Sequence, residues 1–305
     1  LLKFILGILV LLLLIYKVGF SDISLKIISI NPLILLTVFI IIFITLFIGA
    51  LNLNILISPL MKVPFSKVFQ YSMISWALGL FIPGKMGEFL IIPLLKKEGI
   101  SIGKGTAITI IDKLITILTL SLFSIIGFLL FLENKTIFKL TISILLLILI
   151  PLFFIFSKNG REIIKKYILR EDSSKFEGFY KVFSYYIKKQ KSILILNLII
   201  TSFKWFLSSI ITYLLFIYYG YHLPIIYIFL ITSMLVMITL IPLTISGLGI
   251  RESSAVLLFS LFGIKSSITI SVYIIQLIVT YILGTTILLF FLKEIKIKSN
   301  DISSL

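Results

Sequence analysis

Long runs of apolar residues constrain the fold of this chain more than any other feature of its sequence. A helix needs about 20 mostly apolar residues to cross the hydrocarbon core of a bilayer. Of the 305 residues, 60% are hydrophobic and 13% are charged, whereas soluble domains carry about 25% charged residues. The sequence therefore predicts an all-α, polytopic membrane helix bundle. Six segments approach or exceed the length of a span: 1–16, 32–58, 105–131, 136–157, 193–219 and 267–292.

Two further apolar regions, 66–95 and 224–263, are interrupted near their middles. The interruptions are the glycine-containing stretches "PGKMGE" (83–88) and "ISGLGIRE" (245–252). With these regions the chain has about eight hydrophobic segments. Each half of a broken region is shorter than, or barely as long as, a full span, so each region is either two crossings or one re-entrant hairpin. The sequence leaves both possibilities open.

The distribution of charge orients the predicted spans. The chain has a net charge of +16, and the segment 158–192 holds ten Lys and Arg against four acidic residues. Basic loops of membrane proteins face the cytoplasm, so we expect this loop and the C-terminus to be cytoplasmic in a multi-pass protein of the cell membrane. The nearly neutral loops 17–31, 132–139 and 220–223 then lie outside. No nucleic-acid-binding motif accompanies the positive charge.

The two interruptions look like copies of one another. Glu88 is followed after eleven residues by Gly99, and Glu252 is followed after eleven residues by Gly263. The pattern predicts a single domain, 1–305, that contains two repeat units, 32–131 and 193–292. Because the broken regions start from opposite faces of the predicted topology, the units would be inverted repeats. Such repeats place a substrate site near the bilayer midplane, at the breaks.

Ionisable side chains within these spans identify a candidate substrate-binding site. Each costs about 2.5–3.5 kcal/mol at a helix centre, so each should face protein or water. A glycine-rich break exposes backbone N–H groups at the start of a half-helix and lets a headgroup approach, while basic side chains hold an anion and carboxylates balance them. The alternative is that the glycines permit tight packing and the charges cap helices. The predicted site comprises Gly84, Lys85, Gly87, Glu88, Asp112, Lys113, Gly247, Gly249, Arg251 and Glu252.

Other charged residues say less about function, and the composition excludes some kinds of metal site. Asp112 and Lys113 either pair with a charge across the bundle or form an interfacial pair. Lys204 beside Trp205 is more typical of a lysine that extends toward the membrane surface. The chain has no cysteine and one histidine, so thiolate and histidine-rich metal sites are excluded, and we predict no cofactor. Phosphate-binding loops, HExxH motifs and nucleophile elbows are also missing from the sequence.

Three motifs in order resemble a known family: "PGKMGE" (83–88), "IIDKLITIL" (110–118) and "ISGLGIRESSAVLLFSLFGI" (245–264). They are similar to those of flippase-like membrane proteins related to the transmembrane region of lysylphosphatidylglycerol synthases. Lys85 and Lys113 stand where that family usually has arginine. The resemblance implies movement of lipids or lipid-linked sugars between leaflets. Larger relatives carry a soluble aminoacyl transferase domain, and we expect no enzymatic activity from this chain.

Together these features favour translocation of an anionic phospholipid or a lipid-linked glycan, with membrane lipids, anionic or polyprenyl-phosphate-linked, as partners. Two alternatives stay open from the sequence. One is a carrier of a small soluble anion that uses the same residues. The other is a non-transporting partner of a glycosyltransferase, with 158–192 as its docking surface. A membrane-embedded transferase ranks last, because only Glu88, Glu252 and Asp112 could act as bases.

Overall fold

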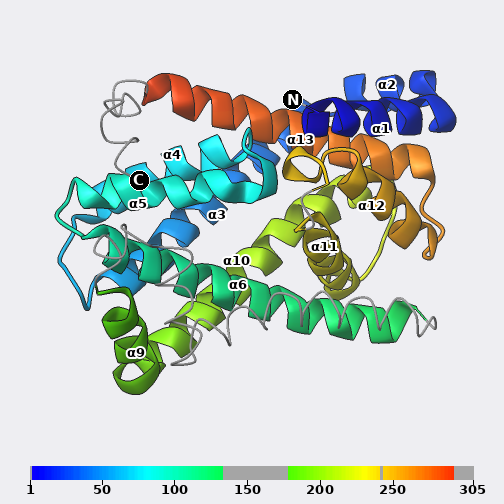
Figure 1. Cartoon of the computed structure of the whole chain (residues 1–305). Helices are drawn as coiled ribbons and strands as arrows, with labels where there is room; N and C mark the ends of the chain where they lie inside the picture. Colours follow the sequence, from blue (N-terminus) through cyan, green and yellow to red (C-terminus); the bar gives the residue numbers. More distant parts are fainter. Residues whose placement is uncertain (1, 133–177, 241–242, 292–305) are drawn as a thin grey trace.

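A computed structural model describes residues 2–132, 178–240 and 243–291 (Figure 1). In these ranges all regular structure is helical, which confirms that the fold is all-α. Four described helices are long and apolar enough to cross a membrane. A fifth candidate is α1 (Leu2–Val18) taken together with α2 (Phe20–Ile28), although the chain bends by 97° between them. The four long helices are α3 (Pro32–Ile57), α6 (Ile102–Phe131), α10 (Lys191–Tyr218) and α13 (Ser266–Phe290).

The described spans number four to five rather than the predicted eight segments. The predicted segment 136–157 lies outside the described residues. The predicted spans 32–58, 105–131, 193–219 and 267–292 match the four long helices to within a few residues. Besides the segment 136–157, the two broken regions are not counted, because their helices are too short to count as spans.

Both broken regions begin with a helix of the same length. The first is α4 (Phe65–Gly79), η1 (Pro83–Leu90, a 3₁₀ helix) and α5 (Ile91–Lys96). The second is α11 (Ile225–Thr239), η4 (Ile245–Gly247) and α12 (Ile250–Ser260). The helices α4 and α11 have 15 residues each, and each follows an N-cap proline. Fifteen helical residues extend about 22 Å, less than the hydrocarbon thickness of about 30 Å, so neither helix spans a bilayer alone.

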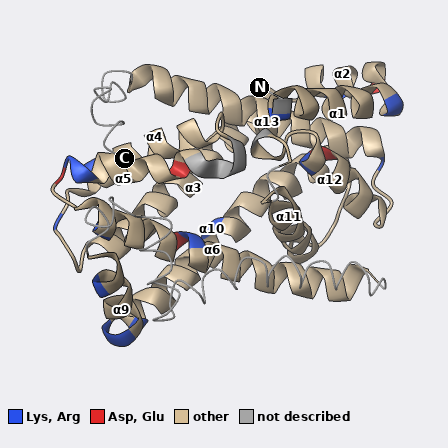
Figure 2. Ribbon diagram, viewed as in Figure 1, with Lys and Arg blue, Asp and Glu red and all other residues tan. Residues whose placement is uncertain are grey.

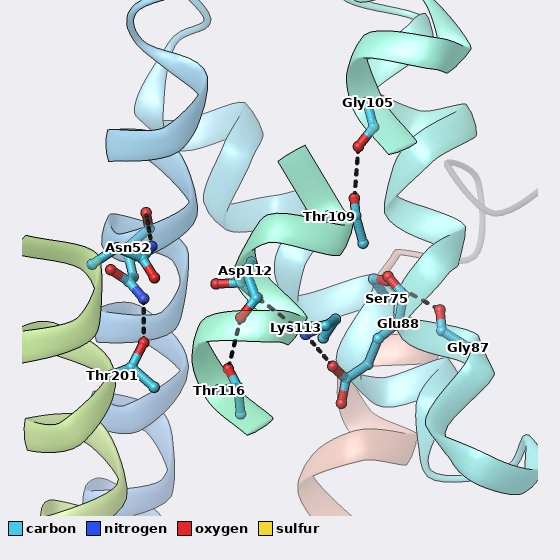
Figure 3. A network of polar contacts seen from close by, with 11 residues as sticks. Asn52, Ser75, Gly87, Glu88, Gly105, Thr109, Asp112, Lys113, Thr116 and Thr201 are labelled. Atoms are coloured by element: carbon cyan, nitrogen blue, oxygen red, sulfur yellow. Dashed lines mark hydrogen bonds and ion pairs between the residues drawn. The ribbon is translucent and has the colours of Figure 1, made fainter. Parts of the chain in front are cut away.

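The first helices of the two halves, α3 and α10, pack against each other in an antiparallel pair. At one end, the Asn31 N–H donates to the Tyr218 hydroxyl over 3.2 Å. At the other end, the Asn52 side-chain amide donates to the Thr201 hydroxyl over 2.9 Å (Figure 3). The first contact joins the start of α3 to the end of α10, and the second joins the last part of α3 to the first half of α10. The two helices therefore run in opposite directions.

The described elements occur in the same order in both halves, and their contacts correspond. The helix α6 packs on α11 as α13 packs on α4, and α5 packs on α6 as α12 packs on α13. A short helix precedes each long first helix: α2 precedes α3, and α9 (Phe179–Lys189) precedes α10. Of these two, α9 packs on α6 and α2 packs on α13. The repeat units 32–131 and 193–292 stay a prediction.

The helices α2 and α9 correct the prediction that 17–31 and the last part of 158–192 are loops. Each has an apolar face at helical spacing, and that face packs against the bundle. In α9 the buried residues are Val182, Phe183 and Tyr186. The Tyr186 hydroxyl donates to the carbonyl of Leu56 at the end of α3. Because the other side of α9 is basic, the count of basic residues in 158–192 did not reveal these buried positions.

Basic residues of the described chain gather at one end of the molecule. Figure 2 shows this end, which is formed by α9 and by the connection between α5 and α6. It is the end that the charge rule predicts to be cytoplasmic, and this orientation stays a prediction. The lysines of α9 are Lys181, Lys188 and Lys189, and those at the connection between α5 and α6 are Lys96, Lys97 and Lys104.

Candidate functional site

The interruptions of the two halves meet inside the bundle. The Ser246 hydroxyl, in η4, donates to the carbonyl of Leu80 at the end of α4 over 3.0 Å. The Tyr281 hydroxyl, from α13, donates to the same carbonyl over 3.1 Å. Ser246 has a φ of 50°, a left-handed conformation that costs about 1–2 kcal/mol for a non-glycine residue. Its hydrogen bond to the other half helps to hold this strained turn, which is typical of functional regions.

A cavity of about 520 Å³ lies beside this meeting point, within the usual size range for small-molecule sites. Its walls come from both halves: α3, α4, η1 and α6 of the first, and α10, α11, α13 and the η4–α12 segment of the second. Polar side chains such as Ser75, Thr109 and Gln276 line it together with apolar ones. Its charged lining residues are Glu88, Asp112, Lys113, Lys204 and Arg251.

One charged cluster of the cavity is centred on Lys113 in α6. The Lys113 ammonium contacts the carboxylate of Glu88 in η1 and lies 3.2 Å from the carboxylate of Asp112 (Figure 3). The Ser75 hydroxyl on α4 donates to the Glu88 backbone carbonyl over 2.6 Å and so fixes η1 against α4. Of the two alternatives that the sequence left open for Asp112 and Lys113, the ion pair of Lys113 with Glu88 agrees with the first, pairing with a motif charge across the bundle. The cluster carries two negative charges and one positive charge.

A second charged cluster joins Arg251 and Glu252 at the start of α12. The Arg251 guanidinium approaches one carboxylate oxygen of Glu252 at 3.0 Å, and the other oxygen accepts the Gly249 N–H over 2.7 Å. Glu252 is fully buried. A carboxylate in the first turn also complements the positive end of the helix dipole. Arg251 in addition lies 5.5 Å from the ring centroid of Tyr273, a cation–π distance.

Three of the predicted site glycines serve close packing. A Cβ atom on Gly87 would lie 2.5 Å from the backbone nitrogen of Gly79. On Gly249 a Cβ would lie 2.7 Å from the Gly7 carbonyl oxygen, and on Gly247 it would lie 2.4 Å from a methyl carbon of Thr239. At these positions the chain itself occupies the space that we expected a headgroup to approach. The alternative of tight packing therefore describes these three glycines.

The structure brings four of the six predicted charged residues to one cavity: Glu88, Asp112, Lys113 and Arg251. Glu252 lies behind Arg251 as its buried partner. The backbone of Gly84 and Lys85 belongs to η1, but the Lys85 side chain lies outside the described part of the structure. Within the described ranges, no three His, Asp or Glu side chains are grouped as a metal site.

Lys204 is the site residue that the sequence interpretation missed. It is the fourteenth of 28 residues in α10, about 20 Å from either end of the helix. That distance is longer than a lysine side chain, so Lys204 cannot extend to the membrane surface as we expected, and it lines the cavity instead. Its central position in an apolar helix was the signal that could have identified it.

Comparison with known proteins gives one family. Residues 1–287 match the sequence model of a family described as the lysylphosphatidylglycerol synthase transmembrane region. The match covers both halves of the chain and both charged clusters. No curated protein matches the chain significantly.

Proposed function

The chain belongs to the lysylphosphatidylglycerol synthase transmembrane-region family, and from this premise we propose that it translocates an anionic phospholipid or a lipid-linked glycan between leaflets. It is an integral membrane protein with several helices long and apolar enough to cross a bilayer.

The cavity where the two interruptions meet is the observation that carries this proposal. Charged side chains inside a membrane bundle are costly, and they mark substrate paths by default. Here five of them line one cavity of about 520 Å³, although the exposed surface of α3 and of α10 is apolar. A lipid needs such a polar interior for its headgroup and an apolar exterior for its acyl chains. The arrangement supports lipid movement over a solely structural role.

The antiparallel packing of α3 and α10 supports the inverted orientation of the two halves. If both helices span the bilayer, they cross it in opposite directions. The elements that follow them have the same order and matching contacts, so each half would then enter the membrane from its own face. Inverted halves can alternate between opening to one side and to the other around a shared site. This gives a passive route that requires no nucleotide-binding domain.

In this proposal the phosphate of the headgroup binds to the basic residues of the two clusters. Arg251 offers several N–H donors, and Lys113 offers a point charge. Because Glu88 and Asp112 both contact Lys113, an arriving phosphate has to compete with them. We infer that Glu88 moves away when the phosphate binds, which would make substrate binding and opening of η1 one event. Lys85, next to this cluster in sequence, would add a further positive charge.

Leaflet exchange in proteoliposomes tests the proposal. The native chain should exchange fluorescent anionic phospholipid between leaflets, whereas Glu88→Gln and Arg251→Ala should each lower the rate about tenfold or more, the equivalent of losing about 1.4 kcal/mol of binding. Asp22→Asn serves as a control, because it changes only an exposed ion pair with Lys26 in α2. Parallel vesicles loaded with labelled inorganic phosphate test the soluble-anion alternative. Exchange of no anionic or polyprenyl lipid by the native chain would refute the proposal.

Single-cysteine labelling tests the inverted orientation without interference, because the chain contains no cysteine. A cysteine placed at Lys97 and one placed at His222 should be reached by an impermeant thiol reagent from opposite sides of the membrane. Labelling of both from one side would contradict the orientation.

A further inference from the structure

Lys204 lines the cavity but belongs to neither of the two charged clusters described above, so its role has to be considered separately. Its helix, α10, contacts α3, α6, α11 and α13, so it touches elements of both halves. Asp112 and Lys113 lie on α6, and the cluster of Arg251 lies on α12, which packs against α11 and α13. Lys204 is thus carried by a helix that contacts α6, which bears the first cluster, and α11 and α13, which pack on the helix of the second, and it lines the same cavity as Lys113 and Arg251.

The side chain of Lys204 is directed by its neighbours into this cavity. The Lys204 ammonium lies 5.7 Å from the ring centroid of Trp205. The lysine stem passes over Gly49 of α3, where an added Cβ would lie 3.7 Å from Cδ and 4.0 Å from Nζ of the lysine. Gly49 and Trp205 both line the cavity. Because residue 49 is glycine, the lysine stem can lie close to the α3 backbone at this point.

The charges of the described cavity are unevenly distributed along it. The cluster of Glu88, Asp112 and Lys113 carries a net charge of −1. The pair of Arg251 and Glu252 is neutral. Lys204 adds one positive charge at the middle of α10. A phosphate group that entered this cavity would therefore meet a third basic residue besides Lys113 and Arg251, at the middle of α10, and an uncompensated negative charge costs most near the centre of a spanning helix.

We propose that Lys204 is the midplane binding position for a phosphate group that passes between the Lys113 cluster and Arg251. The inference rests on the proposed function and names its substrate chemistry: a phosphate-bearing group, held by an ammonium with up to three N–H donors. Gly49 acts as a positioning residue, because it admits the lysine stem. The phosphate can belong to a lipid headgroup or to a free anion, and the experiment separates these sources.

The test combines five variants of the full chain with two readouts, and the fifth variant is Gly49→Ala. Lys204→Gln removes the charge, Lys204→Arg keeps it, and Gly49→Leu displaces the side chain while the charge stays. Phe203→Leu is the neighbouring control, since Phe203 is exposed on the outer surface of α10. The readouts are leaflet exchange of anionic phospholipid in proteoliposomes and thermal stabilisation of the purified protein by inorganic phosphate or glycerol phosphate.

We expect Lys204→Gln and Gly49→Leu each to lower lipid exchange about tenfold and to abolish stabilisation by phosphate. Lys204→Arg should keep both within about threefold of native, and Gly49→Ala should have a smaller effect than Gly49→Leu, because its added Cβ makes an ordinary contact. Native exchange and native stabilisation in Lys204→Gln would overturn the inference. If the native chain exchanges no lipid, the proposed function fails, but loss of phosphate stabilisation in Lys204→Gln would still support a free-phosphate site, and unchanged stabilisation would overturn it.

Discussion

Lys113 of α6 forms an ion pair with Glu88 of η1, and this contact ties the broken segment of the first half to a spanning helix. The pair is partly exposed to the cavity, with 33% of the Lys113 side chain and 24% of the Glu88 side chain accessible. It is therefore both a structural tie and a group that a substrate can reach.

A double-mutant cycle should detect coupling between the two residues. We expect Lys113→Gln and Glu88→Gln to destabilise the protein singly, and the cycle to give a coupling energy of about 1–2 kcal/mol, below the value for a fully buried pair because the cavity admits water. Denaturant unfolding in detergent measures the free energies. The exposed pair Lys26 and Asp22, 3.9 Å apart with 69% of the Asp22 side chain accessible, should give about 0.5 kcal/mol or less. Equal coupling in the two cycles would contradict this interpretation.

Removing the charge of Glu252 should be more damaging. Its carboxylate is fully buried, caps α12 through the Gly249 N–H and pairs with Arg251. Glu252→Gln leaves the guanidinium without a countercharge and should cost about 3 kcal/mol in the free energy of unfolding. The double variant Glu252→Gln with Arg251→Gln should recover part of that loss. A single variant with the native melting temperature would show that the pair contributes nothing.

Gly87 should tolerate no side chain. A Cβ there would lie 2.5–2.7 Å from backbone atoms of Gly79 and Leu78, so Gly87→Ala forces η1 away from α4 and should cost about 3 kcal/mol. Gly105 of α6 is the matched control. Its Cβ would meet the Ile92 side chain at 3.5 Å, an ordinary contact, and Gly105→Ala should be neutral or stabilising by about 0.5–1 kcal/mol through helix propensity. Thermal unfolding of both variants decides the comparison.

Alkaline pH should destabilise the protein partly through Tyr219, which lies just after α10. Burial and the neighbouring Tyr218 raise the pKa of Tyr219 from 10.0 to about 12. The unfolded chain therefore loses this proton at a lower pH than the folded protein does. Its contribution to stability is complete below pH 10 and is lost as the pH rises from 10 to about 12.

Tyr219→Phe should flatten the decline of stability in this pH window, and tyrosinate absorbance of the folded protein should show one fewer late-titrating hydroxyl. The Tyr219 hydroxyl also donates to the Lys26 carbonyl over 2.7 Å, so the variant loses one hydrogen bond at every pH. An identical pH slope in native protein and variant would rule out Tyr219 as a source of the alkaline loss.

The long helices, which a local run of apolar residues determines, could be predicted from the sequence. Apolar runs longer than 20 residues identified α3, α6, α10 and α13, because lipid selects for length and composition alone. The glycine-containing stretches 83–88 and 245–252 located both broken regions. The same reasoning missed α2 and α9, because in such short helices only the packed face is apolar and the average composition resembles a basic or polar loop.

Which residues belong to the site depended on contacts between helices, and the local sequence pattern does not determine these contacts. The sequence marked Glu88, Lys113, Arg251 and Glu252 as charges that need partners, since a charge in lipid is costly wherever it lies. Only the packing of α6 against η1 decided that Glu88 pairs with Lys113, and only the crossing of α3 and α10 directed Lys204 into the cavity over Gly49. By itself the sequence determined which residues must be buried or paired, because the cost of removing a side chain from water depends on residue type. The tertiary structure decided which atoms meet, because pairing depends on the distances between helices that are far apart in the chain.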